Sequence, residues 1–163
     1  MSIPSLHATQ IALPAKSRKA MVQVLNQHLA DLLDLVSQLE NAHWNVRGPH
    51  FFSLHKAFEE ISGLIEGEID TLAERITTLG GVAEGSLRQA AEHSRLPEFP
   101  GKVQGLELAA ALAVSVGQCA NALRNDVAAA EKADDPGTAD LLTGLSQVLD
   151  KSLWLLEAHT PTS

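Results

Sequence analysis

The sequence contains no tyrosine, a single cysteine and few aromatic residues, which make up 4% of its 163 positions. Because one cysteine, Cys119, cannot form an internal disulfide, a disulfide-stabilised scaffold is excluded. Glycine, at 11 residues, is too rare for a collagen-like chain, and a hydrophobic fraction of 45% is too high for a disordered one. The composition therefore predicts one soluble domain with a hydrophobic core.

The sequence also lacks the features of an exported or membrane-spanning chain. Its first residues show no basic stretch followed by an apolar one, so we expect no secretory signal. The longest apolar stretch, residues 106–123, is interrupted by Glu107, Gln118 and Asn121, which favours a buried helix over a membrane span. The lone cysteine is typical of a reducing compartment.

Basic residues are scarce and unevenly placed. The formal net charge is -8, from 12 Lys and Arg against 20 Asp and Glu. Residues 1–30 contain Lys16, Arg18 and Lys19 and no acid, so the rest of the chain, with nine basic and 20 acidic residues, carries a charge of -11. Because such an acidic body repels nucleic acid and attracts cations, we expect only the N-terminal region to contact a phosphate backbone.

Helical periodicity is the strongest positive signal in the chain. Apolar residues recurring at steps of three and four predict four long helices, over about residues 17–46, 53–79, 103–132 and 136–159. A short helix is predicted over residues 86–94. The predicted helix boundaries carry typical residues: Gly48-Pro49 and Gly80-Gly81 as stops, Asp135 as N-cap and Pro136 at a first helical position.

Four long helices without strand-like alternation predict an all-α four-helix bundle. The connection between the second and third long helices is long and contains the short extra helix, so these two helices can run parallel. A short loop would force them into an antiparallel hairpin. Residues 1–15, which include Pro4 and Pro14 and show no sustained period, are predicted to form a mobile arm, and residues 16–163 the domain.

Two groups of polar residues stand out against this pattern. His43 continues the apolar series of the first helix by one more step of four. On the second helix, at about 100° per residue, a stripe of histidine and carboxylate residues lies away from the apolar face. Its members are His55, Glu59, Glu66, Asp70 and Glu74. A core histidine bonded to a carbonyl, and a solvated charged face, are the alternative interpretations.

The stripe is too long to hold one metal within one chain. At a rise of about 1.5 Å per residue, His55 and Glu74 lie about 28 Å apart along the helix axis. If two copies of this helix pack antiparallel about a point between residues 64 and 65, His55 lies opposite Glu74 and Glu59 opposite Asp70, twice per dimer. Small residues lie near that crossing: Ser62, Gly63 and Gly67.

The residue types of the candidate ligands indicate which metal would bind, and these ligands are His43, His55, Glu59, Asp70 and Glu74. Two imidazoles and three carboxylates without a thiolate are unlike a structural zinc site and too rich in nitrogen for calcium or magnesium. The set suits Fe(II), with manganese, cobalt or zinc as competitors, and carboxylates also stabilise the ferric product. The sequence has no Glu-x-x-His motif on each of two helices, so an intrachain di-iron site of that design is not expected.

Five segments add a more specific pattern. They are residues 43–49 (HWNVRGP), 51–55 (FFSLH), 70–76 (DTLAERI), 79–81 (LGG) and 149–154 (LDKSLW). Together they resemble the signature of the Dps family, the DNA-binding proteins from starved cells or miniferritins, over about residues 20–160. The resemblance implies a ferritin-like bundle of which twelve copies form a hollow homododecamer.

The resemblance also implies an activity and a location. In the family, Fe(II) is oxidised at dimer interfaces, preferably by hydrogen peroxide and otherwise by dioxygen. The ferric mineral is stored inside the cage, which protects the bacterial cytoplasm against oxidative stress. By family position, His43, His55 and Glu59 come from one subunit and Asp70 and Glu74 from its mate. Many members have Asp in place of Glu59, whose additional methylene is expected to change occupancy of a second, weaker iron position.

Two further family properties are less well matched. Members that bind DNA usually do so through a mobile lysine-rich arm, and this chain offers only Lys16, Arg18 and Lys19, so we expect weak DNA binding at most. Three acidic residues resemble in position those that line threefold pores in the family, with capping or ordinary solvation as the alternative role: Asp134, Asp135 and Asp140.

Two alternatives to a ferroxidase stay open. One is a nucleoid-binding structural protein, and the other is a protein whose metal site is occupied by zinc.

Overall fold

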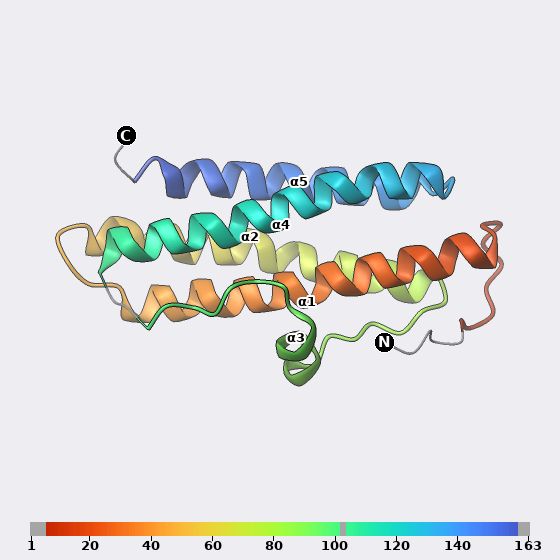
Figure 1. The fold of residues 1–163 in the computed structure, drawn as a ribbon, viewed down its shortest axis with the longest axis horizontal. Coiled ribbons are helices and arrows are strands. Elements are labelled where there is room, and N and C mark those ends of the chain that lie inside the picture. Colours follow the sequence, from red (N-terminus) through yellow and green to blue (C-terminus); the bar gives the residue numbers. More distant parts are fainter. Residues whose placement is uncertain (1–5, 102–103, 160–163) are drawn as a thin grey trace.

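The structure is a computed structural model that describes residues 6–101 and 104–159. The described residues form five α-helices (Figure 1). They are α1 (Ala15–Asn45), α2 (Phe51–Thr78), α3 (Leu87–His93), α4 (Gly105–Lys132) and α5 (Pro136–Glu157). Each begins and ends within two residues of its predicted limits, although Val103, where the third long helix was expected to begin, lies outside the described residues.

The residues expected at helix boundaries have the predicted roles. Gly48 and Gly80 adopt φ values of 108° and 86°, a left-handed conformation that favours glycine after a helix or in a tight turn. The Asp135 side chain accepts a hydrogen bond from the backbone N–H of Thr138 at 3.0 Å, and Pro136 is the first residue of α5.

The four long helices form the predicted bundle. In Figure 1, α1 and α2 run in opposite directions, as do α4 and α5, whereas α2 and α4 run the same way. Residues 79–101, which carry α3, run along the length of the bundle and make this parallel arrangement possible. The prediction drawn from the length of this crossover is therefore confirmed.

The apolar stripes of the long helices meet in one core. On α2 the fully buried side chains follow the predicted periodicity: Leu54, Phe58, Ile61, Ile65, Leu72 and Ile76. Each such side chain contributes about 1.5–3 kcal/mol by leaving water. Cys119 on α4 is buried among them, and burial raises the pKa of its thiol to about 12, so it behaves as a small apolar residue.

Helix α4 is long and apolar enough to cross a membrane by length and composition alone. In the structure it packs along α5 and contributes Leu108, Leu112, Val116 and Leu123 to the core, all of them fully buried. We therefore assign it as a core helix of the bundle, as the polar interruptions in its sequence predict.

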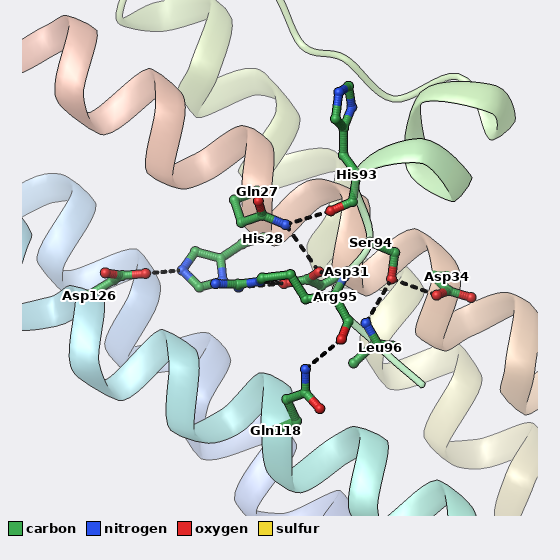
Figure 2. A network of polar contacts seen from close by, with 10 residues as sticks. All are labelled: Gln27, His28, Asp31, Asp34, His93, Ser94, Arg95, Leu96, Gln118 and Asp126. Atoms are coloured by element: carbon green, nitrogen blue, oxygen red, sulfur yellow. Dashed lines mark hydrogen bonds and ion pairs between the residues drawn. The ribbon is translucent and has the colours of Figure 1, made fainter. Parts of the chain in front are cut away.

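A network of polar contacts holds the crossover against the bundle (Figure 2). Asp31 of α1 is 2% exposed and accepts hydrogen bonds from the backbone N–H of Arg95 at 2.9 Å and from its guanidinium Nε at 3.0 Å. Gln27 donates to the carbonyl of His93 at 2.9 Å, and Gln118 of α4 donates to the carbonyl of Arg95 at 2.7 Å. The segment after α3 is thus bound to both α1 and α4.

His28 lies at the edge of this network, fully buried between α1 and α4 (Figure 2). Its Nε2 lies 2.8 Å from a carboxylate oxygen of Asp126. Burial lowers the pKa of His28, and the contact with Asp126 opposes this effect without overcoming it. His28 is therefore a neutral histidine at neutral pH.

The described part of the predicted arm, residues 6–14, lies against the C-terminal end of α2. The backbone N–H of His7 donates to the carbonyl of Gly80 at 2.7 Å. Arg18 donates to the carbonyls of Leu79 at 3.0 Å and Leu13 at 3.2 Å, so its guanidinium binds the end of that helix. Residues 1–5 lie outside the described residues, and the mobility of the arm stays a prediction.

Candidate metal centre

Two histidines meet where α1 ends and α2 begins. Nδ1 of His43 lies 2.9 Å from the backbone oxygen of His55, and Nδ1 of His55 lies 2.9 Å from the backbone oxygen of His43. The two rings are stacked, with centroids 3.9 Å apart and planes inclined by 16°. The short loop of residues 46–50 makes this contact possible by returning the chain directly onto the end of α1.

These bonds determine which ring nitrogen can bind a metal. A carbonyl oxygen only accepts hydrogen bonds, so Nδ1 of each imidazole must carry the proton. In the neutral ring, Nε2 then carries the lone pair that coordinates a metal. Histidine ligands in metal sites are commonly oriented in this way, by donation from the other ring nitrogen to a carbonyl or carboxylate. The pair thus has the ring orientation that histidine ligands commonly have, and its role as a ligand pair stays a prediction.

Glu59 follows His55 by one helical turn and is exposed. The pKa of its carboxyl is lowered, first because Lys56 donates a hydrogen bond to it at 2.7 Å and also because of the nearby imidazoles of His43 and His55. The carboxylate therefore lies near both histidines. The structure brings three of the five predicted residues to one end of the bundle.

One neighbour of this group was not predicted from the sequence. The ring of Phe51 stacks on that of His55, with centroids 5.2 Å apart and planes inclined by 25°. The signal that could have identified it is the spacing of four residues on α2, which places both side chains on one face of the helix. Phe51 thus packs against one face of the His55 ring.

Asp70 and Glu74 lie on the opposite half of α2, exposed to solvent and far from the histidines. Asp70 borders a groove between α1, α2 and the start of the crossover that is lined by apolar side chains including Leu33 and Ile69. Among residues 6–101 and 104–159, no three His, Cys, Asp or Glu side chains gather closely enough to hold a metal. The described chain therefore carries the predicted ligands as two separate groups, and their role as ligands stays a prediction.

The middle of α2 has the surface that a crossing helix would need. A Cβ built on Gly63 or Gly67 would meet no atom within 4 Å, and both glycines are exposed. Nothing within the described chain therefore requires a glycine at either position, although each weakens the helix by about 1 kcal/mol relative to alanine. Ser62 differs from the expectation, because it is buried on the core side and cannot lie at the crossing.

The three candidate pore residues have different environments. Asp134, with a φ of 55°, and Asp140 are exposed and border a hollow between the end of α4 and the start of α5. Asp135 is 1% exposed, caps α5 and forms an ion pair with Arg75 of α2. Its carboxylate is occupied within the fold, so we assign Asp135 a structural role. A pore role stays a prediction for Asp134 and Asp140.

Comparisons with known proteins agree with this architecture. A family model described as a ferritin-like domain matches residues 22–162. The chain is 36% identical to the DNA protection during starvation protein of Agrobacterium fabrum, over 94% of this chain and 95% of the relative. The structure resembles DpsC from Streptomyces coelicolor with a TM-score of 0.91 at 30% identity, covering 98% of this chain and 95% of that one.

It also resembles a Dps protein from Vibrio cholerae O1, described as a member of the superfamily of ferritin-like diiron-carboxylate proteins. That match has a TM-score of 0.87 at 26% identity and covers 95% of this chain and 98% of the other. The bundle with its parallel α2 and α4, the short helix in the crossover and the extent of these similarities lead to one conclusion. The chain belongs to the Dps family of ferritin-like proteins.

Proposed function

We propose that this protein oxidises Fe(II) at sites shared between two copies of the chain and stores the ferric product inside a dodecameric cage. The observation that carries the proposal is the reciprocal bonding of His43 and His55, which leaves two Nε2 atoms ready to coordinate a metal beside Glu59.

The second half of each site would come from another copy. With two α2 helices antiparallel about a point between residues 64 and 65, Asp70 and Glu74 of one copy lie opposite Glu59 and His55 of the other. The exposed glycines at positions 63 and 67 support such a close approach. Because the crossing repeats every ligand by symmetry, each dimer would hold two sites.

Iron is the metal that this donor set suits best, and here it is the substrate. Imidazole nitrogens bind Fe(II), and the carboxylates favour the ferric ion that oxidation produces. Two Fe(II) ions each give one electron to one hydrogen peroxide molecule. With two added waters the products are two FeO(OH) and four protons, so no hydroxyl radical is released. Zinc prefers similar ligands and is expected to compete without undergoing oxidation.

The excess of acidic residues after residue 30 supports the entry of iron cations into the cage. Asp134 and Asp140 are exposed near the start of α5, where they would attract cations in an assembled cage. This role and the predicted location in the bacterial cytoplasm belong to the same proposal. In that compartment the reaction would remove both iron and peroxide before they react with each other.

A structural role on the nucleoid is the second candidate. It is favoured by the exposed Lys16 and Lys19 at the start of α1, which twelve copies would present together. Arg18, the third predicted contact, binds the carbonyls of Leu13 and Leu79 and does not extend toward a partner. With two lysines per chain above an acidic body, DNA binding would be weak and sensitive to salt.

The proposal is tested by mixing assembled protein with Fe(II) and hydrogen peroxide and following the rise in ferric absorbance. Asp70→Ala with Glu74→Ala should reduce the rate to that of iron in buffer, whereas Glu98→Ala, which removes an exposed carboxylate of the crossover, should leave it unchanged. Equal rates in the wild type and the double variant would contradict the proposal and favour the structural role. Elemental analysis of the purified protein reports whether zinc occupies the site.

A further inference from the structure

We propose that Lys56 determines the metal stoichiometry of the site, by holding the Glu59 carboxylate so that each site binds one metal tightly and a second only weakly. This inference rests on the proposed function, because it concerns the same histidine and carboxylate ligands. It identifies a specificity-determining residue that is not itself a metal ligand.

The observation is a direct contact on the face of α2 that carries the site. Nζ of Lys56 donates to Oε2 of Glu59 at 2.7 Å. The imidazoles of His43 and His55 act electrostatically on the same carboxylate, so the ammonium group and a metal held by these histidines would compete for it. A metal that binds Glu59 through this oxygen must share its electron density with Lys56 or displace it, and both weaken the bond to the metal.

In the isolated chain this contact is weak. The side chains of Lys56 and Glu59 are 56% and 53% exposed, and an exposed pair three residues apart on a helix contributes little to stability. Pairing of two α2 helices changes its surroundings. By the same antiparallel register, Lys56 lies opposite Ala73 of the second copy, within one helical turn of that copy's Asp70 and Glu74.

Placed there, the ion pair would lose much of its water. Coulomb interactions strengthen as the effective dielectric constant falls, so Lys56 would hold Glu59 more firmly in the assembled protein than in the free chain. The neighbouring carboxylates of the second copy would also attract the ammonium group and keep it in the site. Assembly therefore converts a weak surface pair into a component of the metal centre.

The charges indicate how many cations the site accepts. Glu59 with Asp70 and Glu74 of the second copy gives three negative charges, imidazoles that bind a metal through Nε2 add none, and Lys56 adds one positive charge. The resulting charge of -2 is neutralised by one divalent cation, held by the histidines and the two unpaired carboxylates. A second divalent cation would enter a neutral site, next to an ammonium group, and compete for the carboxylate that Lys56 holds.

Anaerobic titration of the metal-free assembled protein with Co(II) tests this inference without any oxidation step. Calorimetry gives the number and affinity of the bound ions, and the visible spectrum of Co(II) reports nitrogen and oxygen coordination. We expect the wild type to bind one Co(II) tightly per His43 and His55 pair and a second one weakly. Lys56→Gln, which keeps helix propensity and removes the charge, should strengthen the second binding by about tenfold or more.

Two matched variants separate this effect from a general change in charge. Lys56→Arg keeps the positive charge beside Glu59 and should preserve the weak second binding. Lys151→Gln removes one exposed lysine from α5, distant in sequence from the site, and should behave as the wild type. Size measurements on every variant confirm that the assembly is intact before titration.

The outcomes distinguish this inference from the function on which it rests. If the wild type binds one Co(II) tightly and Lys56→Gln leaves the second affinity unchanged, the role of Lys56 is overturned while the shared metal site stands. Equal, tight binding of two ions in the wild type overturns it in the same way. If the wild type binds no Co(II) at the histidine pair, the proposed function fails and the inference fails with it.

Discussion

His43 and His55 orient each other: Nδ1 of each imidazole lies 2.9 Å from the backbone oxygen of the other residue. The arrangement joins the last turn of α1 to the first turns of α2. Since both Nδ1 atoms are occupied by carbonyls, both Nε2 atoms are left for coordination. If these histidines are metal ligands, as we propose, the fold of one chain orients them before any second copy binds.

The glycines of α2 provide a test of the crossing. A Cβ at Gly63 or Gly67 meets nothing within 4 Å in the chain, so Gly63→Leu with Gly67→Leu should preserve or increase helicity, by up to about 1 kcal/mol per position. The same side chains would separate two crossing helices. Circular dichroism should show a folded protein, and analytical ultracentrifugation should show the loss of the dimer and cage. A variant that still assembles and oxidises iron at the wild-type rate would refute this crossing.

The ion pair between Arg75 and Asp135 should contribute strongly to stability. Asp135 is 1% exposed and Arg75 is 23% exposed at the side chain, so Arg75→Ala leaves a buried carboxylate without its partner. We expect a loss of about 2–4 kcal/mol in the free energy of unfolding. Chemical denaturation at a fixed protein concentration measures it.

The control for this prediction is Arg124→Ala. Arg124 pairs with Asp150 between α4 and α5, where the two side chains are 52% and 49% exposed, so the loss should be at most about 1 kcal/mol. If the two arginine variants lose the same stability, burial of Asp135 is not what makes its ion pair important.

His28 should make the protein less stable in acid. Burial lowers its folded pKa below the ordinary value of 6.5, although Asp126 opposes the shift. Between the folded and the unfolded pKa of His28, the unfolded chain binds more protons than the folded one. The contribution of neutral His28 to the free energy of unfolding is therefore complete above about pH 6.5 and is lost as the pH falls toward the folded pKa. His28→Gln should therefore reduce the fall in melting temperature between neutral and mildly acidic pH.

His93→Gln is the matched control, because the ring of His93 points away from the polar network in Figure 2. That variant should keep the wild-type dependence of melting temperature on pH. A His28→Gln protein with the same acid sensitivity as the wild type would show that other groups cause it.

DNA binding should depend on salt and on two lysines. At low salt and neutral pH, the exposed Lys16 and Lys19 of many copies should retard DNA weakly in a gel. Near about 0.15 M salt the retardation should disappear, because few phosphates are contacted and the acidic body repels the rest. Lys16→Ala with Lys19→Ala should abolish the low-salt shift. Retention of DNA by the wild type at about 0.15 M salt would be the contrary result.

The fold follows closely from local features of the sequence. Apolar periodicity located the helices, Asp135 with Pro136 located the start of α5, and the long crossover determined that α2 and α4 run parallel. The candidate ligands on α2 were also chosen from periodicity, because a stripe of histidine and carboxylate residues is visible on a helical projection. Their role as metal ligands stays a prediction.

The parts that sequence did not reveal depend on tertiary contacts. Nδ1 of each histidine, His43 and His55, can reach the backbone oxygen of the other only because the loop between α1 and α2 holds the two backbones close together. Arg75 and Asp135 are 60 residues apart, so no local pattern indicates that they pair. Ser62 was assigned to the crossing from its size alone, whereas its angular position on α2 places it in the core.

Subunit complementation tests the shared site most directly. One chain carries His43→Ala with His55→Ala and the other carries Asp70→Ala with Glu74→Ala. Each assembled alone should lack rapid oxidation of Fe(II) by peroxide. In mixed dimers the intact histidines of one chain meet the intact carboxylates of the other at one of the two sites.

With random pairing, half of the dimers are mixed, so co-assembly should restore about a quarter of the wild-type rate. Cages that contain both chains, as shown by two different affinity tags, but that oxidise Fe(II) no faster than either variant alone would contradict a metal site divided between two copies.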